Sequence, residues 1–132
     1  MPSRVTPFFA FLLLGFASVG CRYTGAMSET LHTDASTSVS GVVGEEMTFD
    51  LPGNAGTGYA WSLNGALPEF LEAVGEATFV ADHAGMPGSS GVTRFQFMAV
   101  ATGSATLRFE YARAWEKDVP PVRWAEVEMS IK

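Results

Sequence analysis

Four segments of the chain alternate apolar and polar residues with a period of two. In an extended strand this alternation sends one set of side chains to each face, so one face is buried and the other contacts water. The apolar positions are Met47, Phe49 and Leu51, then Phe95, Phe97 and Ala99, then Ala105, Leu107, Phe109 and Tyr111, and finally Val127, Met129 and Ile131. A further strand is expected over residues 59–63, and residues 101–104 fit a tight hairpin turn between the second and third segments.

Residues typical of turns separate these segments, and the sequence shows no long amphipathic helix, internal repeat or heptad pattern. About seven short strands in roughly a hundred residues are typical of a β-sandwich. We therefore predict an all-β fold, an immunoglobulin-like antiparallel β-sandwich of about seven strands. Residues 68–74 fit either a helical turn or a strand, and Trp61 is expected in the core. Trp124 falls in the solvent phase of the last segment, which indicates a bulge or an exposed aromatic.

The first twenty residues differ in character from the rest of the chain. Arg4 precedes an apolar run over residues 8–16, and small residues then lead to Cys21. This order is typical of a secretory signal peptide, and the run is shorter than the roughly 20 residues that span a bilayer. The ending Ser-Val-Gly-Cys resembles a bacterial lipobox, with Ser18 at a position that is usually Leu. Cys21 is therefore a candidate for lipidation, the alternative being an ordinary signal peptide followed by an incidental cysteine.

The chain is therefore expected to contain three regions. Residues 1–20 form the signal peptide, residues 21–36 a flexible tether rich in Ser, Thr, Ala and Gly, and residues 37–132 the folded domain. We expect an exported protein, either a cell-envelope lipoprotein attached to the membrane through Cys21 or a periplasmic or secreted protein.

Composition limits the chemistry of the folded domain. The 132 residues are 47% hydrophobic and 17% charged, which supports one domain. Eight basic and fourteen acidic residues give a formal charge of −6, which argues against nucleic-acid binding because phosphates attract clustered Lys and Arg. Two histidines, His32 and His83, and one cysteine cannot supply the usual four ligands of a His/Cys zinc site. We expect a monomer that is not an enzyme and uses no metal or cofactor.

Three loops have compositions unlike those of simple turns. Residues 52–59 contain three glycines within six residues, so the backbone at Thr57 can approach another surface closely. Residues 82–91 are mostly small, and residues 112–121 contain a Trp and an Arg, two residue types enriched at binding hot spots. Counted along the strands, the three loops take the B–C, D–E and F–G positions, which emerge at one end of an immunoglobulin-like sandwich. Such a set of loops is suited to filling a cleft.

The ordered set of loops resembles the chagasin-type inhibitors of papain-like cysteine proteases. Their immunoglobulin-like domain carries an Asn-Pro-Thr-Thr-Gly-Tyr loop, a Gly-x-Gly-Gly loop and an Arg-Pro-Trp loop. The matching residues are Asn54, Ala55, Gly56, Thr57, Gly58 and Tyr59, then Gly88, Ser89, Ser90 and Gly91, then Arg113, Ala114 and Trp115. The resemblance covers residues 37–132. Ala55 and Ala114 stand in place of prolines, Gly56 in place of Thr and Ser90 in place of Gly, and loss of the prolines removes conformational restriction.

The resemblance implies reversible, competitive inhibition without catalysis. Thr57 would lie near the catalytic cysteine and histidine of a papain-like protease. The Gly88–Gly91 backbone would pair with the non-primed side of the cleft, as a peptide adds to a strand edge. Arg113 and Trp115 would pack on the primed side.

Other interpretations of these residues stay open at this stage. Exposed Trp115 and Trp124 could form a stacking platform for carbohydrate in an adhesion module, or the chain could be a structural envelope lipoprotein without a ligand. At the level of single side chains, Trp115 could be a buried loop plug, and Arg113 could pair with Glu110 or Glu116.

Overall fold

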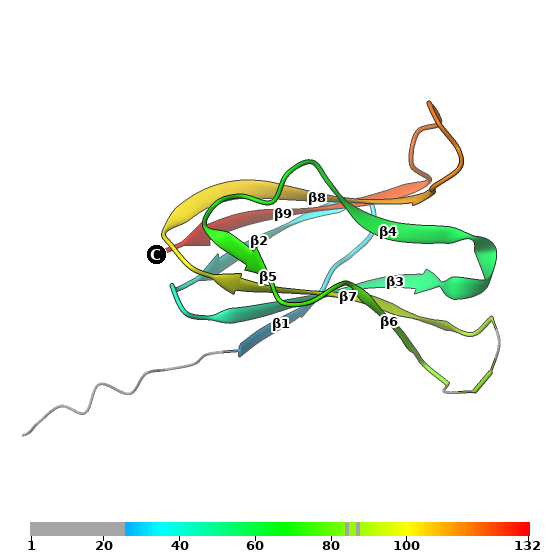
Figure 1. Ribbon diagram of the computed structural model, residues 1–132, viewed down its shortest axis with the longest axis horizontal. Helices are drawn as coiled ribbons and strands as arrows, with labels where there is room; N and C mark the ends of the chain where they lie inside the picture. The colour runs from blue at the N-terminus through cyan, green and yellow to red at the C-terminus, as the bar shows by residue number, and fades with distance from the viewer. Residues whose placement is uncertain (1–25, 84, 87) are drawn as a thin grey trace, which may run out of the picture.

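Two β-sheets pack face to face in the computed structural model, which describes residues 26–83, 85–86 and 88–132 (Figure 1). The strands are β1 (Ala26–Thr30), β2 (Ala35–Gly41), β3 (Glu46–Asn54), β4 (Tyr59–Asn64), β5 (Leu71–Ala73), β6 (Thr78–Ala81), β7 (Ser90–Ala99), β8 (Gly103–Arg113) and β9 (Arg123–Ile131), with a 3-10 turn, η1 (Ala55–Thr57), between β3 and β4. One sheet has the order β1-β3-β7, with β5 and β6 one after the other along the outer edge of β7. The other has the order β2-β9-β8-β4.

This sandwich confirms the predicted fold class, and every strand predicted from the alternation lies within an observed strand. The core is aromatic at its centre, where the Phe49 ring lies 6.2 Å from that of Phe97 and 6.5 Å from that of Phe109, centroid to centroid. Such pairs contribute about 0.5–1.5 kcal/mol beyond the burial of their area. Trp61 is 4% exposed, which confirms its expected place in the core.

The predicted tether is wrong over residues 26–36. β1 and the start of β2 lie within that range, and Leu31 is 1% exposed. The two strands pair in parallel, β1 with β3 and β2 with β9, so both sheets are mixed where antiparallel sheets were expected. The described residues accordingly form nine strands and not seven. β1 lies wholly within the predicted tether, and with Met27 as its one large apolar residue its apolar period is weak. Residues 1–20 and Cys21 lie outside the described residues.

The predicted hairpin at residues 101–104 is also wrong, because β7 and β8 belong to different sheets and the connection crosses between them. Alternation shows which face of a strand is buried but not which strand is its neighbour. Of the two positions left open, residues 68–74 form a turn followed by β5. Trp124 is half-buried in a regular pair with Glu110, without a bulge, and the Arg108 guanidinium lies 5.0 Å from its ring.

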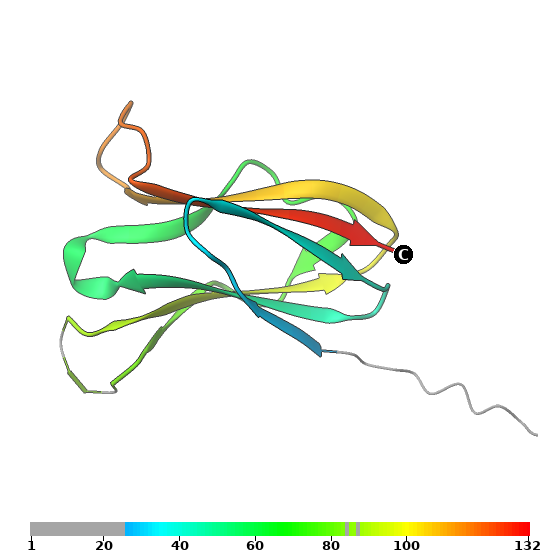
Figure 2. The ribbon, with the colours of Figure 1, turned by 180° about the vertical axis from the view of Figure 1, so that it is seen from behind.

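Strand directions separate the two ends of the molecule. The β3–β4, β6–β7 and β8–β9 connections all lie at one end, as predicted (Figure 1). Ala26 and the C-terminus lie at the opposite end, which the view from behind also shows (Figure 2). The site is therefore built from three loops far apart in the sequence.

Candidate functional site

The first loop is closed by its own side chains. Asn54 ends β3 and caps η1, its Oδ1 accepting a hydrogen bond from the Gly56 amide at 2.9 Å. Thr57 Oγ1 donates to the Asn54 carbonyl at 3.1 Å and accepts from the Tyr59 amide at 3.4 Å. Asn and Thr favour such local bonds to the backbone. The loop therefore has an internal support that does not depend on proline, and Thr57 stays exposed at its tip.

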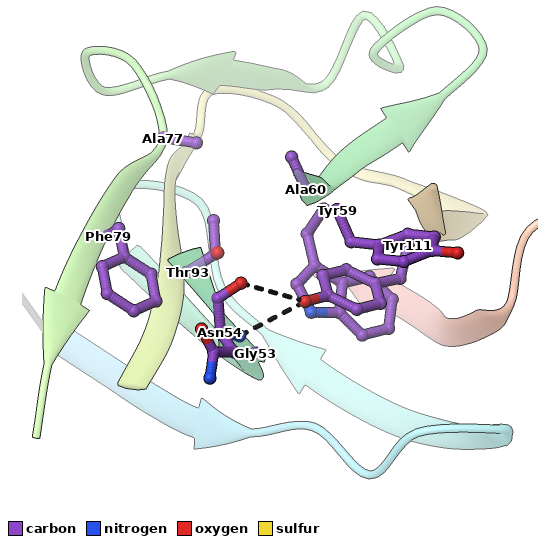
Figure 3. A pocket seen from close by; sticks show the side chains of 9 residues that line it. Gly53, Asn54, Tyr59, Ala60, Ala77, Phe79, Thr93 and Tyr111 are labelled. Carbon is purple, nitrogen blue, oxygen red and sulfur yellow. Dashed lines mark hydrogen bonds between the residues drawn. The ribbon is translucent and has the colours of Figure 1, made fainter. Parts of the chain in front are cut away.

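The base of this loop rests on the aromatic core. The Tyr111 hydroxyl accepts from the Asn54 amide at 3.2 Å and lies 3.3 Å from the Asn54 carbonyl, to which it donates (Figure 3). The Tyr111 ring packs against two rings of β4, with its centroid 5.0 Å from that of Trp61 and 5.4 Å from that of Tyr59. Trp61 Nε1 donates to the Pro52 carbonyl at 2.9 Å. Both strands that enter and leave the loop are thus held by buried rings.

The second loop contacts the first directly. Asn54 Nδ2 donates to the Gly88 carbonyl at 3.0 Å, and a Cβ at Gly56 would lie 3.2 Å from the Gly88 Cα. Gly88 has a φ of +74°, a left-handed conformation that favours glycine. Ser90 pairs with Asn54 at the end of the β3–β7 ladder and donates through Oγ to Asp82 at 3.1 Å. Gly91 pairs with Gly53 and is buried, while Ser89 is half-buried.

The third loop packs on the first through Trp115 and Gly58. Gly58 has a φ of +76°, and a Cβ on it would collide with the six-membered ring of the Trp115 indole. The missing side chain is therefore what allows the indole to lie against the first loop. Trp115 remains 67% exposed, so it is not a buried loop plug.

Arg113 is engaged inside the site. Its guanidinium lies 4.3 Å from the Tyr59 ring centroid and 5.8 Å from that of Trp115, and Nη1 donates to Glu116 Oε1 at 3.1 Å. Of the two acidic partners considered, Glu116 is therefore the one found, while Glu110 accepts from Arg108. A cation over an exposed aromatic ring contributes about 0.5–1 kcal/mol. The side chain joins Tyr59 at the start of β4 to Trp115 in the third loop.

All three predicted loops thus meet at one end, and each is tied to the first by a named contact. The first loop brings Asn54 to Tyr59, the second Gly88 to Gly91, and the third Arg113 and Trp115. One supporting group was missed from the sequence, the Tyr111 hydroxyl, whereas Glu116 was one of the two partners considered for Arg113. Tyr111 was recognised by its alternation as a core residue, but nothing in the pattern indicated that its hydroxyl would reach Asn54.

Two arginines with a raised pKa, Arg94 and Arg108, lie on the outer faces of the sheets, away from these loops. Hydrogen bonds to Asp50, at 2.9 and 3.0 Å, raise the pKa of the Arg94 guanidinium above its ordinary value. Hydrogen bonds to Glu110 and Glu126 raise the pKa of Arg108 in the same way. Within the described part of the chain, no cluster of His, Cys, Asp or Glu side chains could hold a metal ion, and no helix is long and apolar enough to cross a membrane.

The β-sandwich presents Thr57 and Trp115 on exposed, glycine-rich loops at one end. Loops presented in this way by a β-sandwich are typical of a binding domain. Residues 42–129 match the chagasin family of peptidase inhibitors, I42, and the chain belongs to this family. Its members are inhibitors and not enzymes, as expected for this chain from its composition.

Relatives with known structures have the same fold. The crystal structure of the cysteine protease inhibitor EhICP2 from Entamoeba histolytica has a TM-score of 0.66 and 25% identity, over 83% of this chain and 98% of that one. The solution structure of Amebosin has a TM-score of 0.55 and 25% identity, over 80% and 98% of the two chains. Amoebiasin-2 of Entamoeba histolytica is 31% identical over 72 residues, which is 53% of this chain and 57% of that protein. The chain therefore matches little more than half the length of this relative.

Proposed function

We propose that the chain is a reversible, competitive inhibitor of papain-like cysteine proteases, and that its three loops enter the active-site cleft together. The observation that supports this most is the direct linkage of the loops, through Asn54 to Gly88 and through Gly58 to Trp115. Membership of a peptidase-inhibitor family and the likeness to a cysteine protease inhibitor support the class of target.

The first loop would occupy the catalytic centre of the protease. Its tip is curled into η1 and closed by the Asn54 and Thr57 hydrogen bonds, so it does not offer an extended peptide for cleavage. Because these bonds exist before binding, little conformational entropy is lost when the protease closes around the loop. They compensate for the proline that is absent at Ala55.

The other two loops would extend the contact along the cleft. The backbone at Gly88 is exposed and available to pair with the non-primed side, as an extended peptide adds to a strand edge. Trp115 would pack its exposed indole on the primed side. Arg113 contributes by holding Tyr59 and Trp115 in place, since its guanidinium already lies against both rings.

The carbohydrate alternative lacks the platform that it requires. It needs two exposed tryptophans, whereas Trp124 is half-buried on a sheet face with Arg108 over its ring.

Export, followed by lipidation at Cys21, is part of the same proposal. Ala26, where β1 begins its pairing with β3, is five positions after Cys21 in the chain. Five residues reach at most about 18 Å. Because Ala26 lies at the end opposite the loops, a lipid at Cys21 would leave the loops directed away from the membrane.

Titration of papain activity with the chain from residue 22 tests the function. We expect competitive inhibition at submicromolar concentration that is lost in the double variant Thr57→Ala/Trp115→Ala. Val42→Ala is the control, because Val42 is 49% exposed and follows the end of β2 at the opposite end, where the next amide, Val43, bonds the Lys132 carbonyl. A folded chain that leaves papain fully active would contradict the proposal.

A further inference from the structure

The sandwich is open along one side, next to the first loop. In the described structure β4 pairs only with β8 and β6 only with β7, so both are edge strands, and they face each other across the gap between the sheets. A pocket of about 290 Å³ lies in this gap, with Tyr59 and Ala60 on one side and Phe79 on the other (Figure 3). We call this pocket, with the two edge strands beside it, the groove; a second hollow of about 340 Å³ lies next to it and has Ala77 in its lining too.

The groove is uncharged, and four of the residues that line it are aromatic: Tyr59, Trp61, Phe79 and Tyr111. No Asp, Glu, Lys or Arg lines either hollow, in a chain of which 17% is charged. Phe79 points its ring into the pocket and yet remains 39% exposed (Figure 3). An inward-facing Phe is ordinarily covered by core residues. Here the side of the sandwich is left incomplete, and an apolar side chain from outside would complete it.

The size and edges of the groove define what fits. A cavity of about 150 Å³ accepts benzene, so the first pocket has room for one large aromatic or aliphatic side chain. Unpaired backbone groups along β4 and β6 can bind the main chain of an extended segment. The occupant is therefore a short extended segment without charge and with at least one large apolar residue.

The position of the groove indicates where that segment comes from. Asn54 and Tyr59 belong to the first loop and also line the pocket, so the groove is continuous with the surface proposed to enter the protease cleft. We propose that the groove binds an uncharged, apolar segment at the rim of the active-site cleft of the same protease. This inference rests on the proposed function and adds a second contact, outside the three loops, that selects among papain-like proteases.

Three variants of the chain from residue 22, which contains every described strand, test the groove against papain. Phe79→Ala removes the ring that forms one wall, and Ala77→Trp fills the groove from a residue outside the strands. Val80→Ala is the matched control, because Val80 is the next residue on β6, is 40% exposed and lines neither hollow. We expect the inhibition constant to rise about tenfold in the first two variants and to stay within about twofold in the third.

Thermal melting separates loss of the groove from loss of the fold. Ala77→Trp removes no core atom, so weaker inhibition at an unchanged melting temperature supports the proposal even where Phe79→Ala unfolds. Unchanged inhibition by Ala77→Trp, with inhibition by the parent chain intact, overturns the groove and leaves the proposed function standing. A parent chain that does not inhibit papain overturns both. A parent dimer that Ala77→Trp converts to a monomer, without a change in inhibition, would assign the groove to a second copy of this chain and overturn the proposal.

Discussion

At the scale of single residues, glycines decide how closely the loops approach one another. Gly58 and Gly65 stand at the two ends of β4, and both have left-handed backbones, with φ of +76° and +86°. A Cβ at Gly58 would collide with Trp115, whereas a Cβ at Gly65 would meet nothing within 4 Å. The two positions therefore separate backbone strain from loss of a loop contact.

Gly58→Ala is expected to displace Trp115 and to weaken papain inhibition by about tenfold or more, the effect of losing one binding hot spot. Both Gly58→Ala and Gly65→Ala carry a conformational cost of about 1 kcal/mol. Inhibition constants and thermal melting of the two variants provide the measurement. Equal inhibition by both variants would show that contact between Trp115 and the first loop is unimportant.

Tyr111→Phe tests the support beneath the first loop. The change keeps the ring between its aromatic neighbours and removes the hydroxyl that bonds both backbone groups of Asn54. Two hydrogen bonds of this kind contribute about 1–3 kcal/mol in total. We expect a matching fall in the free energy of unfolding, measured with urea, and weaker inhibition. Tyr59→Phe is the comparison, because no hydrogen bond to its hydroxyl is found among the described contacts.

At the scale of elements, the strands that enter the loops are fixed by neighbours remote in sequence. Asp50 on β3 is 9% exposed and accepts two hydrogen bonds from Arg94 on β7, at 2.9 and 3.0 Å. Both strands continue into the first and second loops, so this pair helps to set their register. On the other side of β3, β1 adds a parallel edge that brings Leu31 into the core.

Leu31→Ala tests whether residues 26–36 belong to the domain. Leu31 is 1% exposed, and truncation of such a buried leucine costs about 2–5 kcal/mol. We expect the midpoint of urea unfolding to fall clearly, while His32→Ala, at the exposed next position, leaves it unchanged. Equal midpoints for the two variants would restore the original interpretation of this segment as a tether.

At the scale of the whole molecule, the two ends of the sandwich have different surroundings if Cys21 is lipidated. The described chain begins at one end and the loops lie at the other, along the full length of β3 (Figure 2). Membrane attachment and protease binding would then use opposite ends without steric conflict.

Expression of the full chain in a bacterium that processes lipoproteins tests this arrangement. We expect the protein in the membrane fraction, with vesicle-bound and lipid-free forms inhibiting soluble papain equally. Cys21→Ser should move it to the soluble fraction with its inhibition intact. Equal soluble recovery of parent and variant would contradict lipidation, and weaker inhibition by the vesicle-bound form would contradict the orientation.

Much of the fold followed from local alternation, because a strand with one buried face repeats every two residues whatever its partner. Met47, Phe49 and Leu51 show this clearly. The alternation was too weak in β1, which has one large apolar residue, and in β2, where Ser and Thr occupy four of seven positions. It carried no information on which strands pair. The hairpin assigned to residues 101–104 was wrong for that reason.

The sequence by itself determined the all-β class, the core positions and the three loops, because periodicity, glycine and turn residues act locally. The tertiary structure alone decided how the loops cooperate. Trp115 lies on Gly58, and Asn54 donates a hydrogen bond to Gly88. The Arg113 guanidinium lies over the Tyr59 ring and donates a hydrogen bond to Glu116. The open side between β4 and β6 was likewise invisible in the sequence, since a groove depends on which edges remain uncovered after both sheets have formed. Contacts between distant residues arise only when the sheets pack, and no local pattern encodes them.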